Sequence, residues 1–235
     1  MVRRPWWVAL VCVAALGMSA CVSVQLPSIA HVHVGHAVTA WPETPGQRGL
    51  LEVARSEAAT IVEHAGYAVA GARDMREVKL HLGHVLHALD PALEREGPGL
   101  GYGLAPALAG AADHLGFAAE ANDASANFRS GLPAVVERLR PLQRQAQVLV
   151  ALSRDARGSG DLAQVVTYSE EVRQRSEALR QELDAASRQL DTLLAAESPA
   201  YRPIAQRYLF GLIRLPSGGW TYAPGVQGSG YGSYR

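Results

Sequence analysis

The stretch LAQVVTYSEEVRQRSEALRQELDAASRQLDTLL, residues 162–194, decides the fold class of this chain. Small and apolar residues recur along it in steps of three and four, which is the spacing of one face of an α-helix. Asp161 stands at the N-cap position, and Gly158-Ser159-Gly160 interrupts the chain just before it. The pattern predicts one long helix whose heptad seam packs on a neighbouring helix of the same chain or pairs with a partner helix. The seam comprises Leu162, Val165, Ser169, Val172, Ser176, Leu179, Leu183, Ala186, Leu190 and Leu193.

Four segments upstream of this stretch carry the same helical spacing of apolar residues. Asp74 and Glu77 form a capping box at the start of one of them, and Pro133 suits the first turn of another. Together with the long helix, these segments predict an all-α fold, a helical bundle with four to five main helices. The four upstream helices are expected over about residues 47–70, 74–90, 105–128 and 131–156.

The rest of the chain predicts irregular structure and short elements. Val32 and Val34 alternate with histidines as in a short strand, although no strand partner is evident nearby. Residues 201–215 suit a further amphipathic helix, and the glycine- and tyrosine-rich residues after them predict a disordered tail. The predicted organisation is a signal peptide over residues 1–20, a histidine-containing segment over 21–46, a bundle domain over 47–215 and a tail over 216–235.

The first residues have the features of an export signal. Arg3 and Arg4 precede an apolar run that is too short for a transmembrane helix. The run leads to Met18-Ser19-Ala20-Cys21, which resembles the lipobox of bacterial lipoproteins. The resemblance implies cleavage before Cys21, lipidation of that cysteine with fatty acids such as palmitate, and anchoring in the bacterial cell envelope. Val22 favours the outer membrane, facing the periplasm; an ordinary secretory signal cut near Ala20 is the alternative.

Composition narrows the classes of partner and of ligand. The chain has 22 basic and 22 acidic residues, and loss of the signal removes two arginines, which leaves a net charge of −2. This balance gives no electrostatic footprint for nucleic acid. Cys12 lies within the signal and Cys21 is the lipidation site, so the mature chain offers no thiolate for a metal and no disulfide.

The eight histidines are the main candidates for chemistry, because all of them lie between His31 and His114. Six fall in the two clusters His31-x-His33-x-x-His36 and His81-x-x-His84-x-x-His87, whereas His64 and His114 are isolated. Neutral imidazole is the commonest protein ligand for metals, and ring pairs three residues apart on a helix are close enough to share an ion. We expect the N-terminal segment and the 74–90 helix to converge on one divalent metal. The candidate ligands are His31, His33, His36, His64, His81, His84, His87 and His114.

Nearby carboxylates complete the predicted site. Glu57, Glu63 and Asp113 could add oxygen ligands, and Asp74 and Asp90 could orient ring N–H groups from outside. Nitrogen and oxygen donors without thiolate favour Cu(II) first, then Ni(II) or Zn(II). Two other interpretations remain open: solvated or pH-sensing histidines, and non-covalent haem of the b type held by two histidines. Covalent haem is excluded because the chain has no Cys-x-x-Cys-His motif.

The stretches EAATIVEHA (residues 57–65) and VKLHLGHVLHAL (residues 78–89) resemble the periplasmic small metal-binding proteins. Those proteins are alanine- and histidine-rich helical bundles that bind copper and other divalent ions. The resemblance covers residues 50–90 and implies metal handling without assigning individual ligands.

Catalysis is not predicted. The chain has no His-Glu-x-x-His zinc motif, no Gly-x-Ser-x-Gly nucleophile elbow and no Glu-x-x-His di-metal motif. The sequence therefore favours an envelope lipoprotein that binds a divalent metal for buffering, delivery or sensing. The alternative is a structural or adaptor lipoprotein that engages an envelope partner through the long heptad helix, and the third interpretation is a haem-binding bundle.

Overall fold

The computed structural model describes residues 28–198, 200–201, 205–209, 212–214 and 220–222, and α-helices make up most of this part of the chain. The predicted all-α helical bundle is confirmed. A single 3₁₀ turn, Pro45–Gln47, precedes the second of the described helices. The helices are α2 (Ile29–Val38), α3 (Leu50–Ala70), α4 (Met75–Leu89), α5 (Leu104–Glu120), α6 (Ala126–Gly158) and α7 (Leu162–Ala195).

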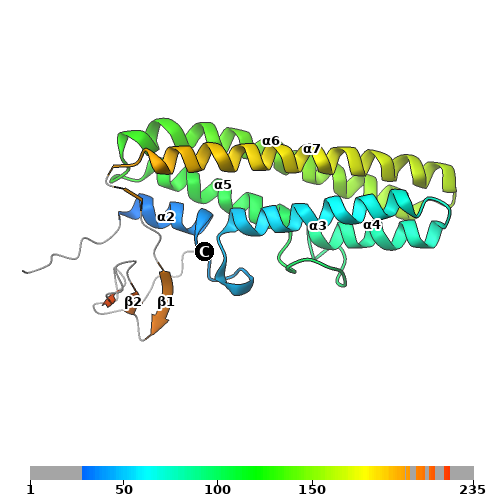
Figure 1. The fold of residues 1–235 in the computed structure, drawn as a ribbon, viewed down its shortest axis with the longest axis horizontal. Coiled ribbons are helices and arrows are strands. Elements are labelled where there is room, and N and C mark those ends of the chain that lie inside the picture. The colour runs from blue at the N-terminus through cyan, green and yellow to red at the C-terminus, as the bar shows by residue number, and fades with distance from the viewer. Residues whose placement is uncertain (1–27, 199, 202–204, 210–211, 215–219, 223–235) are drawn as a thin grey trace, which may run out of the picture.

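The long helices α6 and α7 run along the whole bundle, as Figure 1 shows. Helices α3 and α4 pack on them towards one end, and α2 and α5 pack together towards the other. From Val165 to Leu190 the seam of α7 is buried against α6 and α3, which confirms its predicted packing within one chain, whereas Leu162 at its start is 36 % exposed. The hydroxyls of its two buried serines bond to the backbone of the same helix: Ser169 Oγ donates to the carbonyl of Val165, and Ser176 Oγ donates to that of Arg173.

Side-chain caps fix where several helices begin. The carboxylate of Asp74 accepts the backbone N–H of Arg76 at 2.8 Å, and that of Asp161 accepts the N–H of Ala163 at 2.9 Å. Both predicted N-caps are therefore present. Since Asp74 is used in this way, the structure shows it as a helix cap and not as a partner of a histidine ring.

The boundary between α5 and α6 differs from the prediction. The expected helix over 105–128 ends at Glu120, and α6 begins at Ala126 because Ser125 Oγ caps the N–H of Phe128 at 3.0 Å. The guanidinium of Arg129 reaches back to close the connecting turn by donating to the carbonyls of residues 121, 122 and 124. Pro133 therefore lies inside α6 and not in its first turn.

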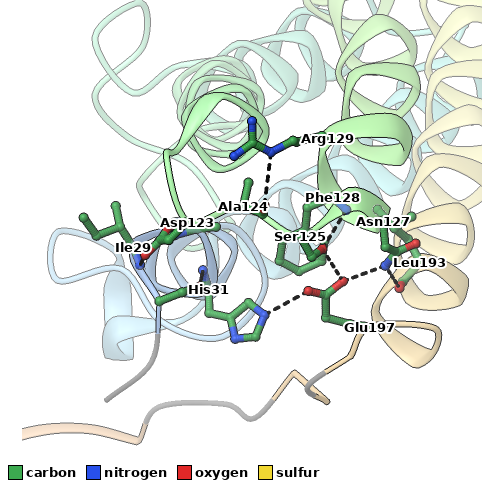
Figure 2. A network of polar contacts seen from close by, with 12 residues as sticks. Ile29, His31, Asp123, Ala124, Ser125, Asn127, Phe128, Arg129, Leu193 and Glu197 are labelled. Atoms are coloured by element: carbon green, nitrogen blue, oxygen red, sulfur yellow. Dashed lines mark hydrogen bonds and ion pairs between the residues drawn. The ribbon is translucent and has the colours of Figure 1, made fainter. Parts of the chain in front are cut away.

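Residues 29–38 form the helix α2, so the expected short strand is wrong. Ser28 Oγ accepts the N–H of His31, and the carboxylate of Asp123 accepts the N–H groups of Ile29 and Ala30 at 2.6 and 3.1 Å. These acceptors satisfy the free donors of the first turn, and small residues of α2 pack on α5. Figure 2 shows this end of α2, with Ile29 beside Asp123 and His31 extended towards Glu197.

After α7 the chain forms a small antiparallel sheet of three strands in the order β1 (Ala205–Leu209), β2 (Leu212–Arg214) and β3 (Trp220–Tyr222). The register pairs Arg214 with both Ala205 and Trp220. The amphipathic helix expected over 201–215 is therefore wrong where the structure describes that segment, which is rich in strand-forming residues. The signal peptide, Cys21 and, apart from β3, the predicted tail lie outside the described residues.

Candidate metal centres

Three histidines from α2 and α5 form a first cluster, called site A. His33 and His36 lie three residues apart on α2, and His114 comes from α5. One ring nitrogen of each lies within 4.8 Å of the other two. The Nδ1 atoms of His33 and His114 are 3.0 Å apart, and Nδ1 of His36 is shielded from solvent without a hydrogen-bond partner. A shielded ring nitrogen that no protein group bonds is available to a ligand at this site.

Aromatic rings enclose site A. The ring centroid of Trp41 lies 4.8 Å from that of His36 and 4.7 Å from that of His114, and Phe117 lies 5.4 Å from His33. Burial, helped by repulsion from neighbouring imidazoles, lowers the pKa of both His36 and His114 to about 4. Burial also lowers the pKa of His33. The imidazoles of site A are thus held in the neutral form that metals require.

A second cluster, site B, joins α3 to α4. His64 comes from α3, and His81 and His84 lie three residues apart on α4. Their Nδ1 atoms converge, at 3.0 Å between His64 and His81 and 3.2 Å between His64 and His84. Burial and the neighbouring imidazoles lower the pKa of His64 and of His84. Tyr67 lines this site with its ring 5.4 Å from His64, and its hydroxyl donates to Glu63.

The spacing of these nitrogens suits a metal ion. Two nitrogens bound at about 2.0 Å in a tetrahedral site lie about 3.3 Å apart, close to the separations in both clusters. Hydrogen bonding alone accounts for them poorly, because a neutral imidazole has one N–H and one lone pair. When the N–H of one ring donates to the facing nitrogen of a second ring, the nitrogen of the third ring in the cluster has no donor. A cation at the centre satisfies all three.

The structure places two predicted ligands elsewhere. Nε2 of His31 donates to the buried carboxylate of Glu197 at 3.2 Å, and Nδ1 of His87 donates to the carbonyl of Glu94 at 2.8 Å. Figure 2 shows His31 turned towards Glu197, which also accepts from Ser125. His31 and His87 therefore hold neighbouring segments in place and belong to neither cluster.

The expected single site, in which the N-terminal segment meets the 74–90 helix, does not form in the described part of the chain. Each cluster of histidines meets a different isolated histidine instead: α2 packs on α5 and reaches His114, whereas α4 follows α3 after a short turn and reaches His64. The prediction of convergence was wrong because it treated residues 22–46 as irregular, whereas residues 29–38 form a helix that packs on α5. The prediction that the isolated histidines take part is consistent with the geometry.

The predicted carboxylates take structural positions. Glu57 is fully buried, and its Oε1 accepts the N–H groups of Leu100, Tyr102 and Gly103, so it anchors the glycine-rich loop. The structure shows Asp90 accepting the N–H of Ala92 after α4, and Asp113 is exposed on α5. Of the predicted carboxylates, Glu63 is the one that lies beside a cluster. Its charge therefore acts to raise the pKa of His64.

A repeated sequence pattern, distinct from the clustering of the histidines, underlies the two sites. His33-Val34-Gly35-His36 matches His81-Leu82-Gly83-His84, and residues 63–68 (EHAGYA) match residues 113–118 (DHLGFA). The two motifs alternate along the chain, yet they pair crosswise in space. The first HxGH motif meets the second copy of the other motif, and the second meets the first. A search for internal repeats could have marked His64 and His114 as members of the sites, although not which HxGH motif each of them meets.

Comparisons with known proteins give no further guide to function. No family model matches the chain, and neither a curated protein nor a solved structure does. Among the described residues, the helices do not combine the length and the apolar character needed to cross a bilayer. The two histidine clusters are therefore the features of the molecule that indicate a function.

Proposed function

We propose that this protein binds two transition-metal ions, one at site A and one at site B. The observation that carries the proposal is the convergence of three imidazole nitrogens at each site, with facing Nδ1 atoms 3.0 to 3.2 Å apart. Each site is built from the same two sequence motifs. Recurrence of the same constellation at two places makes a chance grouping of surface histidines a poor explanation.

The donor set indicates the kind of metal. Both clusters offer imidazole nitrogen, and neither contains sulfur. This set suits Cu(II), Ni(II) and Zn(II), and the general order of affinities puts Cu(II) first. Three protein ligands leave a fourth position for water or for a ligand from solution, which favours exchange of the metal over permanent structural use.

The cellular role follows from the predicted export signal. The lipobox-like Met18-Ser19-Ala20-Cys21 supports a lipid anchor at Cys21 and a place at the bacterial envelope. A bundle held at the membrane with two exchangeable sites suits buffering, delivery or sensing of periplasmic metal. Radioactive palmitate should label the wild-type protein and not Cys21→Ala, and the variant should appear in the soluble fraction. Equal labelling of both would contradict the anchor.

A titration of the chain from residue 22 onward with Cu(II), Ni(II) and Zn(II), by calorimetry with metal analysis, tests the binding itself. We expect two ions per chain, with Kd values below about 1 μM, which corresponds to about −8 kcal/mol each. His36→Ala/His114→Ala and His64→Ala/His84→Ala should each leave one ion. His31→Ala is the matched control, since this residue lies outside the clusters, and it should keep two ions. Loss of binding in the control equal to that in the site variants would refute the assignment.

The two other functions draw no support from the geometry. The seam of α7, on which the adaptor interpretation depended, is buried within the bundle. Haem ligation by two histidines needs a porphyrin between the rings, whereas the facing nitrogens of each cluster are already in contact. We therefore propose metal binding and neither of the other two functions.

A further inference from the structure

A cavity of about 230 Å³ adjoins site B. His84 lines it from α4, Glu94 and Glu96 line it from the loop after α4, and Arg157 lines it from the end of α6. The guanidinium of Arg157 packs over Gly83, 3.5 to 3.7 Å from where a Cβ would stand. The site therefore has a charged neighbour that its three histidines do not supply.

Glu94 is fixed in this cavity from two sides. Its Oε2 pairs with Nη1 of Arg157 at 2.5 Å, and its backbone carbonyl accepts Nδ1–H of His87 at 2.8 Å. His87 is 7 % exposed, and Gly97 packs so closely on it that a Cβ there would stand 2.7 Å from the ring atom Cγ. The loop that carries Glu94 is thus held firmly beside α4, which gives the predicted ligand His87 a different task.

The orientation of His84 leaves one ring nitrogen for this cavity. Nδ1 faces Nδ1 of His64, so Nε2 lies on the opposite edge of the ring, away from the centre of site B. Glu94 and His84 line the same cavity from opposite elements, the loop after α4 and α4 itself. The carboxylate of Glu94 is not among the atoms that converge within 4.8 Å, so it is placed outside the ligand set.

We propose that Glu94 is the carboxylate that positions His84 for metal binding, acting on its Nε2–H directly or through one water molecule. A carboxylate on the outer ring nitrogen fixes the tautomer, so that the Nδ1 lone pair faces the metal, and makes the imidazole a stronger ligand. Arg157 holds Glu94 back from the metal, and His87 holds its backbone. This inference depends on the proposed metal binding at site B and adds a positioning residue to it.

The test removes the charge of Glu94 with little change in shape. In a His36→Ala/His114→Ala background, which leaves site B alone, the affinity for Cu(II) should fall at least 10-fold in Glu94→Gln. Glu96→Gln is the matched control in the same cavity and should stay within about 2-fold of the background. Glu94→Asp should recover part of the affinity, and the electron paramagnetic resonance spectrum of bound Cu(II) should change in Glu94→Gln alone. Equal affinity and spectra in Glu94→Gln and the background would overturn the proposal.

A further variant separates positioning from support of the loop. Arg157→Gln breaks the ion pair but keeps the carboxylate, and it should retain Cu(II) affinity within about 3-fold because His87 still holds the loop. If Arg157→Gln loses as much affinity as Glu94→Gln, the ion pair only holds the loop and the proposal is wrong. Absence of Cu(II) binding in the background itself would refute the proposed function, and this assignment with it. Helicity by circular dichroism, equal in all variants, confirms that each is folded.

Discussion

Binding of a metal at site A should release very few protons, because its histidines are already neutral. A metal displaces the proton of any imidazolium that it binds, so proton release counts the rings that were charged beforehand. Burial holds the pKa of His36 and His114 at about 4, well below the ordinary value of 6.5. A site made of solvated surface histidines would lack this property.

The difference in proton release between solvated and buried histidines is already large at pH 6. An imidazole with a pKa of about 6.5 is about three-quarters protonated there, whereas one with a pKa of about 4 is about 1 % protonated. Three ordinary histidines would therefore release about 2.3 protons per metal. His36 and His114 should release almost none, and His33, whose pKa is also lowered, should release less than about 0.8.

Calorimetry in buffers of different ionisation enthalpy measures this release directly. The titration uses the His64→Ala/His84→Ala variant, so that site A alone takes up Zn(II) or Cu(II). The expected result is fewer than about 0.8 protons per metal at pH 6, with little change between pH 5.5 and 7. Release of two protons or more would show that the rings of site A are ordinary solvated imidazoles and would refute the argument from burial.

Four further outcomes follow from the same structure. Without metal, the lowered pKa values at site A make the unfolded chain bind more protons between pH 6.5 and 4, so urea midpoints should fall as the pH drops through that range; a flat profile would contradict the burial. Glu57→Ala leaves three backbone donors without their acceptor and should lower the free energy of unfolding by about 3 kcal/mol or more in a urea titration. Leu183→Asp puts a charge into the buried seam of α7 and should destabilise the bundle by more than about 4 kcal/mol, visible as lost thermal cooperativity; a normal melt would mean that the seam is not buried in solution. Gly49→Ala brings a Cβ against the backbone of Val38 and Thr39 and should lower the melting temperature by several degrees, whereas Gly158→Ala, which meets no neighbouring atom, should change it far less.

The long helices were predictable because their signal is local and repeated many times. The seam of α7 runs over ten positions, and Asp74 and Asp161 mark starts that the structure keeps. Helix α2 was not predictable in this way, since the acceptor of its first N–H groups is the carboxylate of Asp123, more than 90 residues away. At the start of α6, the guanidinium of Arg129 likewise donates to a carbonyl outside its own helix, eight residues earlier in the turn before it. Local periodicity carries no information about such contacts.

The sites were predictable by residue type but not by pairing. The clusters at residues 31–36 and 81–87 stood out in the sequence, and two rings of each do enter a site. His31 and His87 have the same spacing as their neighbours, and only the surrounding Glu197 and the Glu94 carbonyl draw them away. The choice of partner depends on which helices pack together, which a histidine count cannot give.

The crosswise pairing of the two motifs would make each proposed metal a reversible cross-link. The facing rings of site A are 81 residues apart along the chain, and those of site B are 17 and 20 residues apart. By the loop-closure relation for covalent bridges, closing these loops is equivalent to constraining the unfolded chain by about 4.5 and 3 kcal/mol. A bundle whose sequence has no cysteine after Cys21 can thus acquire bridges that a chelator removes. Resistance of the bundle to unfolding and proteolysis then becomes a measure of the metal available around it.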